Sequence, residues 1–138
     1  MKKQTLAVAV AVVISLVTAG HSVARPRVLS AYIPFQFEVG SSKLPAGQYE
    51  IESVTTGNGT IQMIRKADGS VSARFSTMVT EPRDGNSSPE LVFHKYGSDY
   101  FLSEIHTGDN HTLRLFESRQ ERESAHNQST VIYALAVR

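Results

Sequence analysis

Residues 91–106 read LVFHKYGSDYFLSEIH, two runs rich in apolar and aromatic side chains that are separated by Gly97-Ser98. A two-residue connection that begins with glycine is typical of a tight β-hairpin, because glycine readily adopts the positive φ that such turns require. We therefore predict strands at Leu91–Tyr96 and Asp99–His106 that pair antiparallel.

Short strands and turns also account for the rest of the chain. Apolar side chains at every second position from Ile33 to Val39 predict a strand with one apolar face. We expect residues 25–31 to form a short lead, 40–43 a turn and 81–89 a long polar loop. Further strands are predicted, in chain order, at Gln48–Thr55, Thr60–Lys66, Val71–Val79, Thr112–Leu115 and Val131–Val137.

One helix is predicted before the last strand. Ser118 and Glu121 are spaced as the first and last residues of a capping box, so the helix should begin after Ser118 and run to about His126. Arg119 and Glu123 lie four residues apart and can pair along it. Together these elements predict an all-β fold, an antiparallel meander of seven to eight strands that forms a small barrel or a coiled sandwich.

The N-terminal residues have the three parts of a secretory signal peptide. Lys2 and Lys3 precede an apolar run from Leu6 to Val17, and small residues follow up to Ala24. The run is too short for a membrane-spanning helix, which needs about 20 residues. We expect residues 1–24 to be removed after Ala24, leaving residues 25–138 as one periplasmic or secreted domain without a membrane span. A retained N-terminal anchor is the alternative.

Composition excludes several classes of function. The chain has 14 Lys and Arg against 13 Asp and Glu, and Lys2 and Lys3 belong to the predicted signal peptide, so 12 basic residues remain against 13 acidic ones. This balance gives no electrostatic reason to expect nucleic acid as a partner. The chain has no cysteine, which excludes disulfides, thiolate metal sites and a cysteine nucleophile.

Four segments together resemble a family of small exported bacterial proteins of uncharacterised function. They are IPFQFEVG at 33–40, LPAGQY at 44–49, LVFHKYG with YFLSE at 91–104, and SRQERE at 118–123. The resemblance spans nearly the whole predicted mature chain. It implies export and a compact single domain, and it brings no known activity, cofactor or binding site.

His94 and Ser103 are the residues that could support hydrolysis. With Gly97-Ser98 as the turn, His94 opposes Phe101 and Val92 opposes Ser103, so His94 and Ser103 lie on one face along a diagonal. A catalytic pair also needs an acid to orient the histidine and donors for an oxyanion, and the sequence offers neither. We therefore predict no catalytic residue and expect His94 to pack on Phe101.

The other polar side chains do not predict a site. His106 and His111 flank a turn that contains Asp109, but their spacing is not that of a metal site, so no metal and no cofactor is expected. Carboxylates within the predicted strands are interpreted as solvated, outward-facing positions. They are Glu38, Glu50, Glu52 and Glu104, with Glu104 opposite Leu91.

The function predicted from these patterns is an exported, non-catalytic β-domain with a binding or structural role in the bacterial envelope. Its partner would be an unknown protein or envelope component. The alternative is a barrel that carries a small apolar ligand, although the bulky inward residues Phe35, Phe37, Phe75 and Phe93 indicate a filled interior. A small hydrolase that uses His94 and Ser103 is the third possibility.

Overall fold

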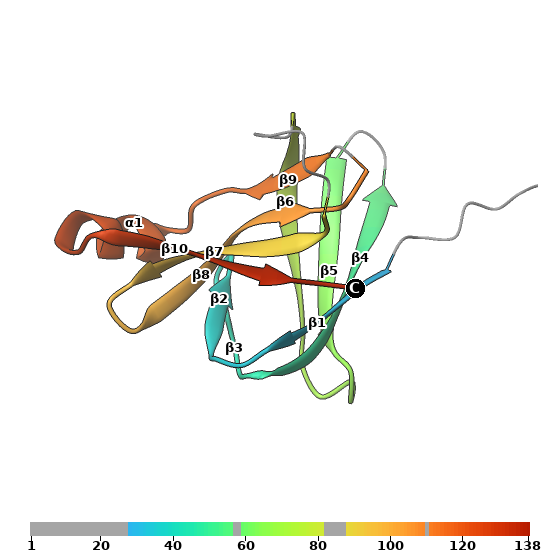
Figure 1. The fold of residues 1–138 in the computed structure, drawn as a ribbon, viewed down its shortest axis with the longest axis horizontal. Coiled ribbons are helices and arrows are strands. Elements are labelled where there is room, and N and C mark those ends of the chain that lie inside the picture. Colours follow the sequence, from blue (N-terminus) through green and yellow to red (C-terminus); the bar gives the residue numbers. More distant parts are fainter. Residues whose placement is uncertain (1–27, 57–58, 82–87, 110) are drawn as a thin grey trace, which may run out of the picture.

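The structure, a computed structural model, describes residues 28–56, 59–81, 88–109 and 111–138. Ten strands and one helix occupy these residues, so the predicted all-β fold with one short helix before the last strand is confirmed (Figure 1). The predicted signal peptide, its cleavage site and residues 82–87 of the predicted loop lie outside the described residues. In chain order the elements are β1 Val28–Ile33, β2 Phe37–Val39, β3 Ser42–Leu44, β4 Gly47–Thr56, β5 Gly59–Lys66, β6 Ser72–Thr80, β7 Glu90–Tyr96, β8 Asp99–His106, β9 Thr112–Leu115, α1 Arg119–Asn127 and β10 Thr130–Ala136.

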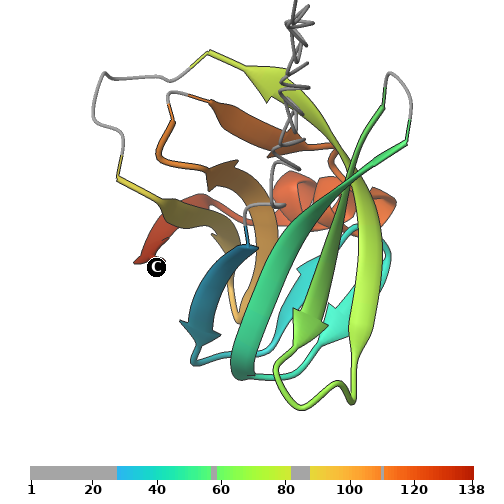
Figure 2. The same cartoon turned by 90° about the vertical axis from the view of Figure 1, so that its right-hand side faces the viewer.

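The strands form a single mixed sheet that is not closed into a barrel. Its order is β1-β4-β5-β6-β9-β8-β2-β3, and β7 pairs with both β8 and β10. The predicted meander is present at β4-β5-β6 and at β7-β8-β9. It does not run through the whole sheet, since β6 pairs with β9 and β2 runs parallel to β8. Figure 2 shows the sheet curled, with β4, β5 and β6 on one side and β8 and β9 on the other.

The predicted strand at 33–39 is in fact two strands. β1 ends at Ile33 and pairs with β4, whereas β2 begins at Phe37 and pairs with β3 and β8. Pro34 lies between them and has no N–H to continue a ladder, which explains the break. The expected lead therefore contains most of β1. The expected turn at 40–43 is shorter than predicted, because Gly40 turns the chain with φ +59° and β3 starts at Ser42.

Aromatic side chains fill the centre of the molecule. Phe37, Tyr49 and Phe93 are fully buried, and the ring of Phe37 lies edge-on to those of Tyr49 and Phe93, with centroids 5.3 Å and 5.6 Å apart. Phe75 is also buried, as predicted, but Phe35 is only partly buried and stacks on Tyr100. The interior is therefore filled at this level of the fold.

Helix α1 lies outside the sheet, at the end of the molecule opposite β4 and β5 (Figure 1). The predicted cap is present, since Ser118 Oγ accepts a hydrogen bond from the backbone N–H of Glu121. The predicted pair is present as well, with Arg119 Nε 2.9 Å from Glu123 Oε1. In the part of the chain that the structure describes, no helix has the length and apolar character needed to cross a membrane.

The C-terminal strand β10 is an edge strand. It pairs with β7 on one side only, and its residues Val131, Ile132 and Tyr133 are exposed. Just beyond β10, Arg138 exchanges two backbone hydrogen bonds with Ser30 of β1, of 2.8 Å and 3.0 Å. The last residue of the chain therefore lies beside the first described strand.

Candidate functional site

His94 has an acidic partner that the sequence did not reveal. Its Nδ1 lies 2.9 Å from Glu121 Oε1, across the contact between β7 and α1, and Glu121 is 4 % exposed. The prediction that no acid orients His94 is therefore wrong. The hydrogen bond to Glu121 raises the pKa of His94 against the opposing effect of burial, and the negative charges of Glu121, Glu104 and Glu117 add to the rise.

Ser103 does not complete a catalytic pair with His94. The predicted hairpin register is correct from Tyr96 to His94, but a bulge between Val92 and Phe93 shifts it, so that Val92 opposes Glu104 instead of Ser103. Ser103 consequently falls at the irregularity. The ring contact of His94 is with Tyr96, at a centroid distance of 6.3 Å, and within the described chain its hydrogen-bond partner is Glu121. His94 therefore bonds an acid but, within the described chain, no nucleophile, and its bond to Glu121 holds α1 against the sheet.

Glu38 is buried, which corrects its predicted outward position. It is 5 % exposed, its Oε1 accepts a 2.9 Å hydrogen bond from Gln120 Nε2, and Lys43 Nζ lies 3.9 Å away. Burial raises the pKa of Glu38, the negative charges of Asp99 and Glu121 raise it further, and Lys43 opposes the rise. The first turn of α1 is thus held to β2 and β7 by two buried carboxylates.

Glu104 is also buried, because the side chains of Arg114 and His106 cover it. Its Oε1 accepts hydrogen bonds from Arg114 Nε and Nη2, and its Oε2 lies 3.2 Å from His106 Nε2. The other ring nitrogen of His106 is 3.1 Å from Glu90. Burial alone would raise the pKa of Glu104, but the hydrogen bonds and charges of His106 and Arg114 outweigh it and lower that pKa.

These contacts take His106 away from Asp109 and His111. Among the residues that the structure describes, no group of three or more His, Asp or Glu side chains converges as a metal site would require. The remaining strand carboxylates, Glu50 and Glu52, face outward as predicted and lie 3.4 Å and 3.9 Å from Arg65. The strand carboxylates Glu38, Glu50, Glu52 and Glu104 are thus all engaged in ion pairs or hydrogen bonds within the fold.

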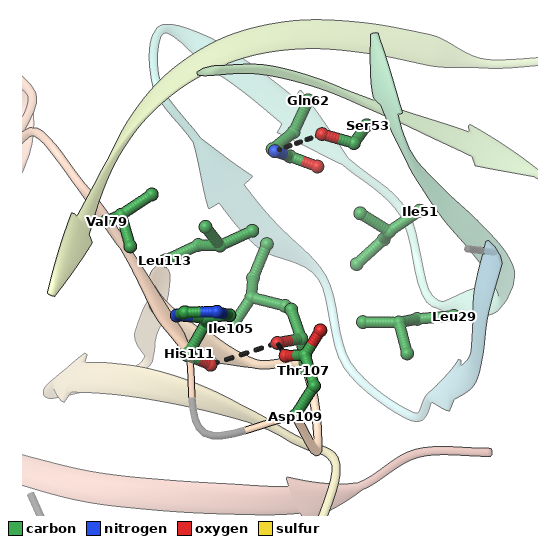
Figure 3. Close-up of a pocket in the computed structure, with 10 residues that line it drawn as sticks. All are labelled: Leu29, Ile51, Ser53, Gln62, Val79, Ile105, Thr107, Asp109, His111 and Leu113. Atoms are coloured by element: carbon green, nitrogen blue, oxygen red, sulfur yellow. Dashed lines mark hydrogen bonds between the residues drawn. The ribbon is translucent and has the colours of Figure 1, made fainter. Parts of the chain in front are cut away.

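A pocket opens at another place, where the inner faces of several strands meet beyond the aromatic centre. It has a volume of about 300 Å³ (Figure 3). Its apolar lining consists of four buried side chains and one exposed one, namely Leu29, Ile51, Ile105, Leu113 and Val79. Such an apolar hollow with a few polar groups is the usual form of a small-molecule site.

Two polar side chains on neighbouring strands lie within this lining. Gln62 of β5 is 2 % exposed, and its Nε2 donates a 3.1 Å hydrogen bond to Ser53 Oγ on β4. Figure 3 shows the carboxamide of Gln62 at the wall of the hollow, with its nitrogen bonded to Ser53. A buried amide that faces a cavity offers a fixed hydrogen-bonding position to whatever occupies it.

The segment after β8 forms the rim of the pocket. Thr107, Asp109 and His111 line it, and the Thr107 hydroxyl is hydrogen-bonded to the Asp109 carboxylate and the His111 carbonyl oxygen. Asp109 and His111, for which the sequence predicted no metal site, thus lie at the rim of an apolar pocket. Sequence reasoning missed Gln62 and Ser53. The available signal was alternation. It places Gln62 on the face of β5 that carries Ile64, and Ser53 on the face of β4 that carries Ile51.

No protein-family model, curated protein or solved structure matches this chain.

Proposed function

We propose that this protein is an exported, non-catalytic binding protein that carries a small, largely apolar molecule in the pocket between β1, β4, β5, β6, β8 and β9. The observation that carries the proposal is the pocket itself. Its volume of about 300 Å³ lies at the lower end of the range for small-molecule sites, about 300–1,000 Å³. Leu29, Ile51, Ile105 and Leu113 give it walls that favour an apolar occupant.

Export is supported by the N-terminal pattern and by the resemblance to small exported bacterial proteins. Mass analysis of protein recovered from cells that express the full chain should give a mature form that begins at Arg25. Recovery of the full-length chain in the membrane fraction would contradict export with cleavage.

A non-catalytic role is supported by the contacts of His94. Its Nδ1 is engaged by Glu121, and the bulge separates Ser103 from the predicted register. We expect no turnover of ester or peptide substrates. Turnover that disappears in His94→Ala while the thermal unfolding transition is kept would refute this part of the proposal.

The pocket is tested with 1-aminonaphthalene, a neutral probe of a size that fits the pocket, whose emission shifts to shorter wavelength in apolar surroundings. We expect saturable binding to the protein, reduced at least about tenfold in Val79→Trp, because a bulky ring at this exposed lining position fills the pocket. Met78→Trp is the matched control. Met78 is the exposed neighbour of Val79 on β6 and points to the opposite face. Equal binding by both variants would place the probe elsewhere and refute the proposal.

A further inference from the structure

We infer that the occupant of this pocket is a neutral aliphatic alcohol, whose hydroxyl group is held between Gln62 and Ser53. The inference rests on the proposed function and specifies the chemical class of the ligand. It depends on the size of the pocket, on its charge and on the hydrogen-bonding capacity of these two side chains.

Size limits the occupant to a medium-length molecule. An engineered apolar cavity of about 150 Å³ holds one benzene ring, and this pocket has about twice that volume. An occupant of roughly 10 to 14 non-hydrogen atoms fits on this scale. The walls made by Leu29, Ile51, Ile105 and Leu113 suit an unbranched or branched alkyl group.

Charge favours a neutral molecule. The ten lining residues include no lysine or arginine, and the charged carboxylate among them is that of Asp109 at the rim. A fatty-acid carboxylate would therefore lose its hydration without a lysine or arginine to pair with, which is costly in an apolar site. Its charge would also be repelled by Asp109.

The hydrogen-bonding pattern favours a hydroxyl over other neutral groups. Ser53 Oγ accepts from Gln62 Nε2, so the Ser53 hydroxyl hydrogen remains able to donate to a ligand oxygen. Gln62 lines the pocket (Figure 3), and its carboxamide oxygen, which takes no part in the bond to Ser53, can accept a hydrogen bond in return. An alcohol can accept from Ser53 and donate to Gln62 at the same time, whereas a ketone can only accept.

The test compares three compounds of nearly equal size by displacement of 1-aminonaphthalene at pH 8: 1-decanol, 2-decanone and decanoate. We expect 1-decanol to bind roughly tenfold more tightly than 2-decanone, because it makes one further hydrogen bond. Decanoate should bind more weakly still. In Gln62→Leu, which keeps the side-chain volume, the preference for 1-decanol over 2-decanone should fall to within about twofold.

Each outcome decides between the two proposals. Failure of the probe and of all three compounds to bind would overturn the proposed function together with the inference. Equal binding of 1-decanol and 2-decanone, or tightest binding of decanoate, would overturn the inference alone. A preference for 1-decanol that persists in Gln62→Leu would also overturn it. If Gln62→Leu does not fold, Ser53→Ala, at an exposed position, gives a different comparison: 1-decanol and 2-decanone both accept from Ser53, so both should bind more weakly while the preference for 1-decanol remains. Loss of that preference in Ser53→Ala would overturn the inference.

Discussion

Replacing Glu121 with glutamine should separate the electrostatic contribution of the α1 contact from its shape. Glutamine keeps the size of the side chain and the backbone N–H bond to Ser118, but it removes the carboxylate that accepts from His94 at 2.9 Å. Hydrogen bonds to charged groups contribute about 1.5–3 kcal/mol to stability. Since domains of this size are stable by about 5–15 kcal/mol, the loss is a substantial fraction of the total.

The loss should depend on pH in a defined direction. Glu121 raises the pKa of His94 above its usual 6.5, so folding favours the protonated imidazole. The added stability is fully present below pH 6.5 and is lost as the pH rises through the raised pKa. We therefore expect Glu121→Gln to cost about 2 kcal/mol at pH 6 and clearly less at pH 9.

Urea unfolding at the two pH values measures this difference. A slope of about 1–3 kcal/mol per molar urea converts the expected loss at pH 6 into a midpoint shift of about 1 M. Subtracting the variant from the unchanged protein at each pH removes the contributions of other titrating groups. Glu123→Gln is the control, because Glu123 pairs with Arg119 on the exposed side of the same helix and should show little change. A loss of equal size at pH 6 and pH 9 would refute the coupling of His94 protonation to folding.

Three further predictions concern the core, a buried acid and the hairpin turn. Phe37→Ala and Phe93→Ala should each lower the free energy of unfolding by about 3–5 kcal/mol, since both rings are fully buried; a loss below about 1 kcal/mol in urea melts would contradict their burial. Glu38→Gln should stabilise the protein at pH 8 but not at pH 4. Burial raises the pKa of Glu38, so at a pH above that pKa the ionised carboxylate destabilises the folded state, and glutamine removes this charge. The same difference in thermal unfolding midpoint at both pH values would disprove this. Gly97→Ala should cost about 1–2 kcal/mol, because Gly97 has φ +60° and an added Cβ would meet the Gln128 side chain; Ser98→Ala is the control, and equal thermal shifts for both would count against the turn geometry.

The sequence predicted the strands where alternation and turn chemistry act together. The hairpin at Gly97 and the cap at Ser118 are local patterns, and both occur as predicted. Alternation also placed Phe37, Phe75 and Phe93 on the buried face. It could not predict what would cover the other face, because that depends on where α1 packs.

The predictions for Glu38 and Glu104 were wrong because side chains from distant parts of the sequence cover these two outer positions. Alternation correctly puts Glu38 opposite in direction to Phe37, but α1 and Lys43 lie over that outer position and bury it. Glu104 is covered by Arg114, which is distant from it along the hairpin pattern but adjacent across β8 and β9. The hairpin pattern also did not predict the bulge between Val92 and Phe93. The pocket was missed because it lies between strands whose neighbours the sequence did not specify.

The two backbone hydrogen bonds between Ser30 and Arg138 have a consequence for the order of folding. β1 lies at the start of the described chain, and one of its neighbours, Arg138, is distant from it in sequence. Parallel pairing of β2 with β8 likewise joins segments that are far apart in sequence. Contacts of this kind require large loops to close before they become favourable, which slows folding. The native arrangement around β1 is therefore complete only once the segment that holds Arg138 has closed onto Ser30.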